Sequence, residues 1–207
     1  MVTRCFVAGL IVTMPLTMQA QGGGTAAPAP QAPPAAPAAP ALTLSAAGFP
    51  DGSDIPVKFT QAAPGAAPGE GTSPALSWTN VPAGTQSFVV NMRDLDVARN
   101  KTTEDQAHWV VWSIPAAATG LPEGVPRGSQ LASGAYQISV TGPVYRGPGA
   151  PATGPKHHYM IELYALDTRL DVQPGTDAFE TRGRVMQAMQ GHVLGKAVYG
   201  GLFRRPQ

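Results

Sequence analysis

Short segments in which apolar and polar positions alternate dominate the chain, and they predict β-strands. The most regular is residues 157–167, where the odd-numbered positions from Tyr159 to Ala165 are all apolar or aromatic. Successive side chains of a strand point to opposite faces of its sheet, so these positions share one buried face. His157 precedes them on the same face, which predicts a histidine where the strand enters the sheet.

Two further segments have the same character. Residues 107–115 are rich in aromatic and β-branched side chains and begin beside His108, whereas residues 87–92 run directly into Asp94 and Asp96. Two strands that open on histidines and one that closes on aspartates predict three strand ends that meet at one pocket. Shorter strands are expected at residues 42–45, 55–59, 74–78, 135–140 and 198–203.

One helix is expected near the C-terminus. Asp177 and Glu180 fit a capping box, and the apolar positions between Val185 and Val193 follow at helical spacing. Gly191 is expected to interrupt this helix, which also carries His192. Many short strands followed by one late helix indicate a mainly antiparallel β domain with a small helical appendix.

The N-terminal residues predict export. Residues 1–20 read as a secretory signal peptide, with Arg4 before a short apolar core and a small-residue cleavage site that ends at Ala20. Residues 21–41 are almost entirely Gly, Ala and Pro and predict a disordered tether. Residues 42–207 then form a single domain, which we expect to be periplasmic or secreted, with no integral membrane segment after cleavage of the signal.

Composition narrows the classes of function. The formal net charge is +1, which gives no basic field for nucleic acid. Charged residues make up only 13% of the chain beside 24 Gly and 22 Pro, a composition that favours turns and short strands over long helices. The single cysteine, Cys5, excludes an intramolecular disulfide. No catalytic nucleophile motif and no metal-ligand spacing is present, so we expect no catalytic residues, no metal and no cofactor.

Eight segments in order over residues 42–203 together resemble the phosphatidylethanolamine-binding protein family, in its bacterial Raf-kinase-inhibitor-like branch. They are Ser73–Trp78, Val81–Phe88, Asp94–Asp96, His108–Val111 with Ile114 and Pro115, Gly120–Gly124, Gly147–Pro148 with Pro151, Gly154–Asp167 and Ala188–Leu194. The resemblance implies an antiparallel, Greek-key β-sandwich with a short C-terminal helix and a pocket for small anions or phospholipid head groups.

The same resemblance implies a set of ligand-binding residues: Asp94, Asp96, His108, Pro151, His157 and Tyr159. We expect protonated His108 and His157 to contact the anion while the two aspartates orient them, because an aspartate beside an imidazole raises its pKa. Leu95 and Ala98 stand where the family has prolines, which predicts a less rigid loop.

Two other functions stay open at this point. The domain can act through its surface as an inhibitor or partner of an envelope enzyme of protease or kinase type, as some relatives do. Two aspartates and two histidines can also bind a metal and support a metal-dependent hydrolase. The resemblance further allows a homodimer.

Overall fold

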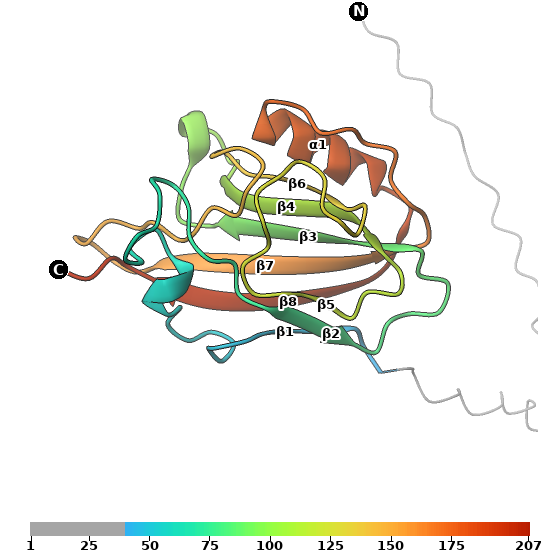
Figure 1. Cartoon of the computed structure of the whole chain (residues 1–207), viewed down its shortest axis with the longest axis horizontal. Coiled ribbons are helices and arrows are strands. Elements are labelled where there is room, and N and C mark those ends of the chain that lie inside the picture. Colours follow the sequence, from blue (N-terminus) through green and yellow to red (C-terminus); the bar gives the residue numbers. More distant parts are fainter. Residues whose placement is uncertain (1–39) are drawn as a thin grey trace, which may run out of the picture. The chain divides into compact units, whose positions relative to one another are not determined.

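The computed structural model describes residues 40–207, which contain eight β-strands, one α-helix and two short 3-10 helices (Figure 1). The predicted signal peptide over residues 1–20, and all but the last two residues of the predicted tether over 21–41, lie outside the described part. Within residues 40–207, no helix combines the length and the apolar character that crossing a membrane requires.

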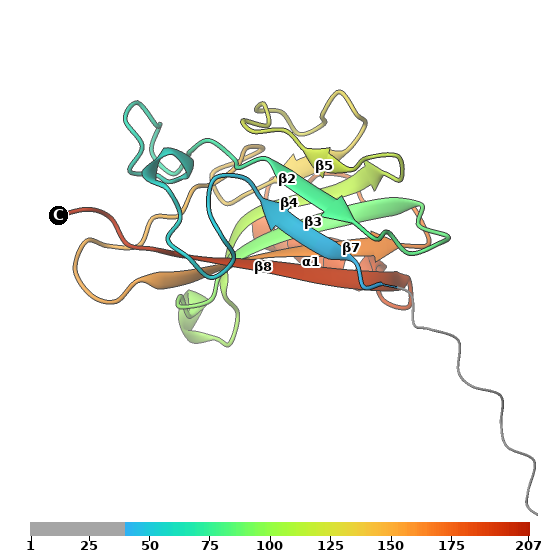
Figure 2. The same cartoon turned by 90° about the horizontal axis from the view of Figure 1, so that it is seen from below.

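The strands form two antiparallel sheets that face each other (Figure 2). The three-stranded sheet has the order β1-β2-β5, with β1 at Thr43–Ala46, β2 at Leu76–Thr79 and β5 at Gly120–Leu121. The five-stranded sheet has the order β6-β4-β3-β7-β8, with β6 at Tyr136–Ile138, β4 at Gln106–Pro115, β3 at Ser87–Asp94, β7 at His157–Leu166 and β8 at Val193–Phe203. This arrangement confirms the predicted mainly antiparallel β-sandwich.

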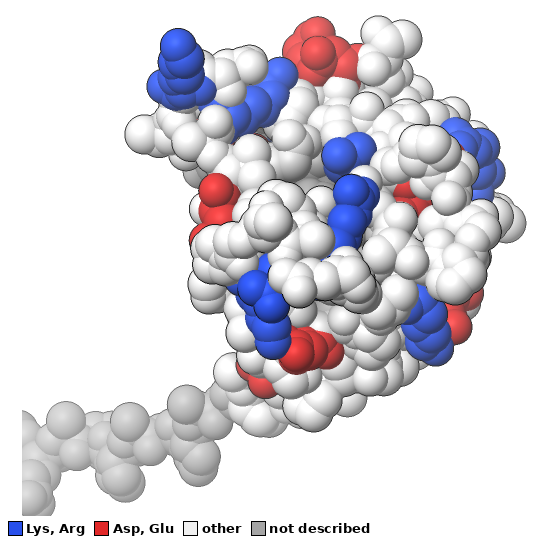
Figure 3. Space-filling view, turned by 90° about the vertical axis from the view of Figure 1, so that its left-hand side faces the viewer, with Lys and Arg blue, Asp and Glu red and all other residues white. Residues whose placement is uncertain are grey.

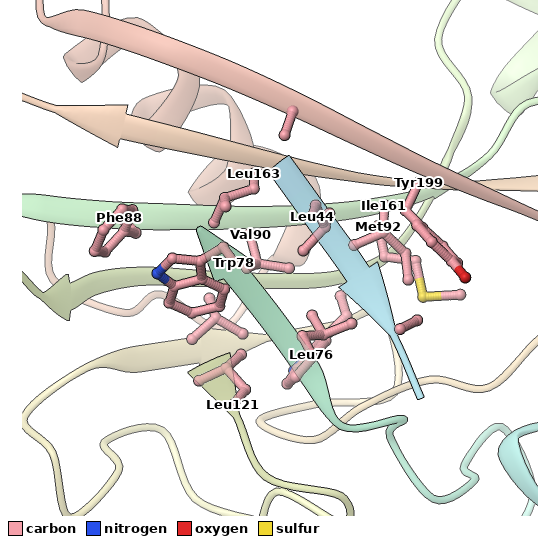
Figure 4. Packing of buried hydrophobic residues seen from close by; sticks show 14 of the residues in the cluster. Leu44, Leu76, Trp78, Phe88, Val90, Met92, Leu121, Ile161, Leu163 and Tyr199 are labelled. Atoms are coloured by element: carbon pink, nitrogen blue, oxygen red, sulfur yellow. The ribbon is translucent and has the colours of Figure 1, made fainter. Parts of the chain in front are cut away.

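The five-stranded sheet separates two hydrophobic cores. Between the sheets, Trp78 of β2 packs against Phe88 of β3, and Leu163 of β7 lies in the same cluster (Figure 4). On the other face, Val89 belongs to a second cluster that α1, at Ala178–Ala188, covers with Val185. The strand β3 is buried along almost its whole length on both faces. Each of its large apolar side chains that is fully buried adds about 1.5–3 kcal/mol to stability.

A β-bulge at Ser113 changes which side chains of β4 face the core between the sheets. Phe88 pairs with Ile114 but Val90 pairs with Val111, so two residues of β4 oppose one residue of β3. Ser113 takes a φ of 54° and its buried hydroxyl donates to the Leu170 carbonyl at 3.0 Å. As a result Ile114 returns to the core that Val111 occupies, although the two residues are three positions apart.

The C-terminal helix begins where it was predicted, after Asp177, but it ends before His192, which was expected to lie on it. The carboxylate of Asp177 accepts hydrogen bonds from the backbone N–H groups of Phe179 and Glu180, each at 2.8 Å. The helix ends at Ala188, and the left-handed backbone of Gly191, with φ 82°, turns the chain into β8. The placement of His192 on this helix was therefore wrong. It lies in the turn, with its Nδ1 atom 2.7 Å from the Asp167 carboxylate.

The strand expected at residues 55–59 does not form. Its place is taken by a 3-10 helix, η1, at Val57–Phe59, while the second 3-10 helix, η2, lies at Arg99–Lys101. Pro56 has no N–H group to donate to a ladder, and only Asp54 makes an isolated bridge to β8. The apolar side chains of this segment still reach the core, where Phe59 is completely buried.

Candidate functional site

Three strand ends meet at one edge of the five-stranded sheet, on the left in Figure 1. The strand β3 lies between β4 and β7, ends at Asp94, and pairs that residue with Tyr159 near the start of β7. A cavity of about 190 Å³ opens at this edge. Five of the six predicted ligand-binding residues line it: Asp94, His108, Pro151, His157 and Tyr159.

Asp96, the sixth predicted residue, is not part of the cavity lining. The β3 strand ends at Asp94, whose Oδ1 atom accepts from the Asp96 N–H at 3.0 Å and so supports a tight turn. Beyond that turn, Asp96 Oδ2 accepts from the N–H of His158 at 2.6 Å and lies 3.0 Å from its Nδ1 atom. Partial burial raises the pKa of Asp96, but the contacts with His158 lower it by more, so the pKa lies below its usual value. Asp96 is thus placed to orient His158 and not a pocket histidine.

His108 is buried and electrically neutral. Its Nδ1 atom lies 3.1 Å from the carbonyl oxygen of Arg146, and since a carbonyl only accepts, Nδ1 carries the proton. Burial lowers the pKa of His108 to about 4, despite this hydrogen bond. The prediction of a protonated His108 near neutral pH is therefore wrong. The ring instead presents Nε2 as a hydrogen-bond acceptor and packs edge-on against Tyr159, with ring centroids 5.1 Å apart.

His157 is held by Asp94, as predicted. Its Nδ1 atom lies 2.8 Å from Asp94 Oδ2, and its ring stacks on Tyr159 with centroids 6.4 Å apart. This contact fixes which ring nitrogen faces the carboxylate, so Nε2 is left for other partners.

Tyr159 fixes the loop that closes the cavity. Its hydroxyl oxygen accepts from the backbone N–H groups of Gly149 and Ala150, each at 3.1 Å. Burial and the neighbouring Asp94 carboxylate raise the pKa of Tyr159 above its usual value, so the hydroxyl keeps its proton. The side chain therefore serves both as an anchor for residues 149 and 150 and as a neutral donor within the site.

Sequence reasoning missed six residues that also line the cavity: Gln61, Val97, Gln106, Arg146, Gly149 and Ala150. Arg146 is the most important of them because it brings a cation. Its backbone is fixed to β4, since the Arg146 N–H donates to the His108 carbonyl at 3.2 Å while its own carbonyl accepts from the His108 ring. The one feature of the sequence that could have indicated Arg146 as a cavity residue is its position directly before Gly147-Pro148.

Gln61 fastens the same loop from the other side. Its backbone N–H donates to the Pro148 carbonyl at 2.9 Å, and its side-chain Nε2 donates to the Gly147 carbonyl at 2.7 Å. The contact is so close that a Cβ atom on Gly147 would lie 2.8 Å from the Thr60 carbonyl carbon and 2.9 Å from the Gln61 nitrogen. Only glycine fits at this position.

Gly147→Ala is expected to lower the free energy of unfolding by about 2–3 kcal/mol, because the added methyl group meets backbone atoms that cannot rotate away. Urea unfolding would measure the change. Gly183→Ala is the matched control, since Gly183 lies within α1 with no atom within 4 Å of the added Cβ. There alanine should stabilise the protein by up to about 1 kcal/mol. Equal stabilities of the two variants would contradict the close contact.

The cavity is not arranged as a metal centre. Across residues 40–207, no group of three or more histidine, cysteine, aspartate or glutamate side chains is placed to hold a metal ion. Asp94 and Asp96 diverge at the turn, and the His108 nitrogen that carries the proton is turned away towards Arg146.

Comparisons with known proteins agree with this site and fold. A family model described as phosphatidylethanolamine-binding protein matches residues 45–204. A protein named UPF0098 protein from Methanothermobacter thermautotrophicus is 39% identical over 166 residues, which cover 79% of this chain and 99% of that protein.

Solved structures show the same fold. A putative phosphatidylethanolamine-binding protein homologue from Chlamydia trachomatis superimposes with a TM-score of 0.64 at 28% identity, covering 80% of this chain and 98% of that one. Escherichia coli YbcL, described as a member of the mammalian family, also gives a TM-score of 0.64, at 23% identity over 79% of this chain and 98% of its own.

Proposed function

This chain belongs to the phosphatidylethanolamine-binding protein family, and from that premise we propose that its cavity reversibly binds small phosphate-bearing anions of the phospholipid head-group type. The observation that carries the proposal is the convergence of His157, Tyr159 and Arg146 on one cavity. All three can donate hydrogen bonds to phosphate oxygens.

The size of the cavity supports a head group and not a whole lipid. Its volume of about 190 Å³ lies below the roughly 300–1,000 Å³ of sites that enclose drug-sized ligands. A phosphate with a short polar substituent fits this space, whereas acyl chains would have to remain outside. His108 Nε2 adds an acceptor for an ammonium or hydroxyl group on the same ligand.

We further propose a binding role in the cell envelope without catalysis. Residues 1–20 support export, and the residues that line the cavity include no serine or cysteine to act as a nucleophile.

Calorimetric titration of the purified protein with phosphoethanolamine and inorganic phosphate tests the proposal. Both ligands should bind, and His157→Ala should weaken them by about tenfold or more, because it removes a hydrogen bond to an anion worth about 1.5–3 kcal/mol. His158→Ala is the control, since that neighbouring ring faces Asp96 outside the cavity. Absence of binding by the unchanged protein, or an equal loss in both variants, would overturn the proposal.

A further inference from the structure

His108, one of the two histidines that the sequence predicted as a source of positive charge at the cavity, does not supply it. His108 is neutral at physiological pH, and Asp94 contributes a carboxylate that repels an anion. A site for phosphate therefore needs cations from elsewhere. Two arginines, Arg146 and Arg205, are placed to supply them, and they are called the arginine pair below.

Arg146 reaches the cavity from a rigidly held backbone. Its N–H and carbonyl groups both bond to His108, and its Nη1 atom donates to the Thr141 hydroxyl at 3.0 Å. Its Nε atom is buried and has no hydrogen-bond partner. A buried guanidinium N–H without a partner costs free energy, which a ligand oxygen would recover.

Arg205 reaches the same rim from the C-terminal segment that follows β8. Its backbone N–H donates to the Ala150 carbonyl at 3.2 Å, and its Nη2 atom donates to Gln61 Oε1 at 3.4 Å. Ala150 and Gln61 both line the cavity. Besides burial, the nearby charge of Arg205 lowers the pKa of Arg146, which places the two guanidinium groups in one electrostatic environment.

The arginine pair differs from most other cations of the described region. Lys58, Arg93, Arg99, Arg127, Lys156, Arg182, Arg184 and Lys196 each form an ion pair with an aspartate or glutamate, whereas no ion pair within residues 40–207 includes Arg146 or Arg205. Figure 3 faces this end of the molecule and shows Lys and Arg side chains spread over it. The rim of the cavity thus carries two guanidinium groups that form no ion pair within residues 40–207, whereas Asp94 is the one carboxylate among the lining residues.

We propose that the arginine pair makes this site selective for doubly charged phosphomonoesters over singly charged phosphodiesters. The inference rests on the proposed function and specifies its ligand class: a terminal phosphate group and not the bridging phosphate of an intact phospholipid. The second negative charge of a monoester interacts with both guanidinium groups, whereas a diester has no such charge to offer. An added negative charge is attracted by both cations, so we expect the affinity for the monoester to be about tenfold higher or more.

Titration of the purified protein with methyl phosphate and with dimethyl phosphate tests this selectivity. Changes in the amide chemical shifts of the protein report binding. The two probes share the phosphate and differ in one methyl group and one charge. At about pH 7.5 methyl phosphate is largely a dianion, because its second pKa is near 6, and the protein should bind it about tenfold more tightly. Near pH 5 both probes are monoanions, so the ratio of their affinities should fall towards one.

Three substitutions separate the arginine pair from a general effect of charge. Arg146→Gln should lower the affinity for methyl phosphate by about tenfold and the exposed Arg205→Gln by about threefold, with smaller losses for dimethyl phosphate. Arg204→Gln removes the same charge from the preceding residue, whose side chain donates to the Gly154 carbonyl and lines a different cavity, beside Lys156. It should leave the ratio unchanged.

The outcomes distinguish this inference from the proposed function. Equal affinities for the two probes at both pH values, or an equal effect of Arg146→Gln and Arg204→Gln, would overturn the selectivity while leaving the phosphate site in place. Failure of the unchanged protein to bind either probe would overturn both.

Discussion

The free energy of unfolding should fall by about 3 kcal/mol less between about pH 7 and pH 4 when His108 is replaced with asparagine. Burial lowers the pKa of His108 to about 4 in the folded protein, whereas an unfolded chain has a histidine pKa of about 6.5. Between these two values the unfolded state binds a proton that the folded state does not. The stability that neutral His108 contributes is therefore present above about pH 6.5 and is lost as the pH falls towards 4.

The size of the effect follows from the pKa difference. A tenfold change in an equilibrium constant corresponds to about 1.4 kcal/mol, so a pKa of about 4 in place of about 6.5 corresponds to about 3 kcal/mol. Asparagine does not titrate, and its side-chain amide can still donate to the Arg146 carbonyl that His108 Nδ1 contacts.

Urea unfolding at a series of pH values from about 7 to about 4 would measure this change. The stability difference between the parent protein and His108→Asn should shrink or reverse by about 3 kcal/mol over that range. His108→Gln also cannot titrate and should show the same pH profile, whatever its stability at neutral pH. Parallel profiles for the parent and both variants would contradict a buried neutral histidine.

Tyr159→Phe should lower the free energy of unfolding by about 3 kcal/mol and weaken phosphate binding at the same time. The substitution removes the single oxygen that accepts from both the Gly149 and Ala150 N–H groups. Each buried N–H that loses its partner costs about 1–3 kcal/mol. The loop that carries these groups also forms the wall of the cavity, so its release should reduce affinity as well as stability.

Tyr136→Phe is the matched control for this experiment. Tyr136 lies in β6 and is half-buried, and its hydroxyl makes no hydrogen bond within residues 40–207. It should change the stability by less than about 0.5 kcal/mol. Urea unfolding and calorimetric titration of the two variants give both readouts. A Tyr159→Phe protein as stable as Tyr136→Phe would show that the loop does not depend on the tyrosine.

The sequence was enough to predict the central strands and five of the eleven residues that line the cavity. Alternation from Tyr159 to Ala165 is a strong signal because a strand has only two faces, and β7 is found at His157–Leu166. The meeting of Asp94, His108 and His157 followed from strand ends alone. The N-cap at Asp177 was predictable because it depends only on contacts two and three residues away.

The features that the sequence did not reveal depend on contacts between distant segments. Residues two positions apart on a continuing strand, such as Asp94 and Asp96, would point to the same face. However, β3 ends at Asp94, and the following turn places Asp96 beside His158. Arg146 enters the site only because its loop docks on His108 and Gln61. The neutral state of His108 likewise arises from burial, which no local pattern of residues specifies.

The hydrogen bond between Arg205 and Gln61 joins residues that are 144 positions apart. Closing a loop of this length costs chain entropy, which the contacts made by the docked C-terminal segment have to offset. The rim of the cavity is therefore complete only after the segment that follows the last strand has docked. A ligand that requires this rim would distinguish finished molecules from those that have only assembled their sheets.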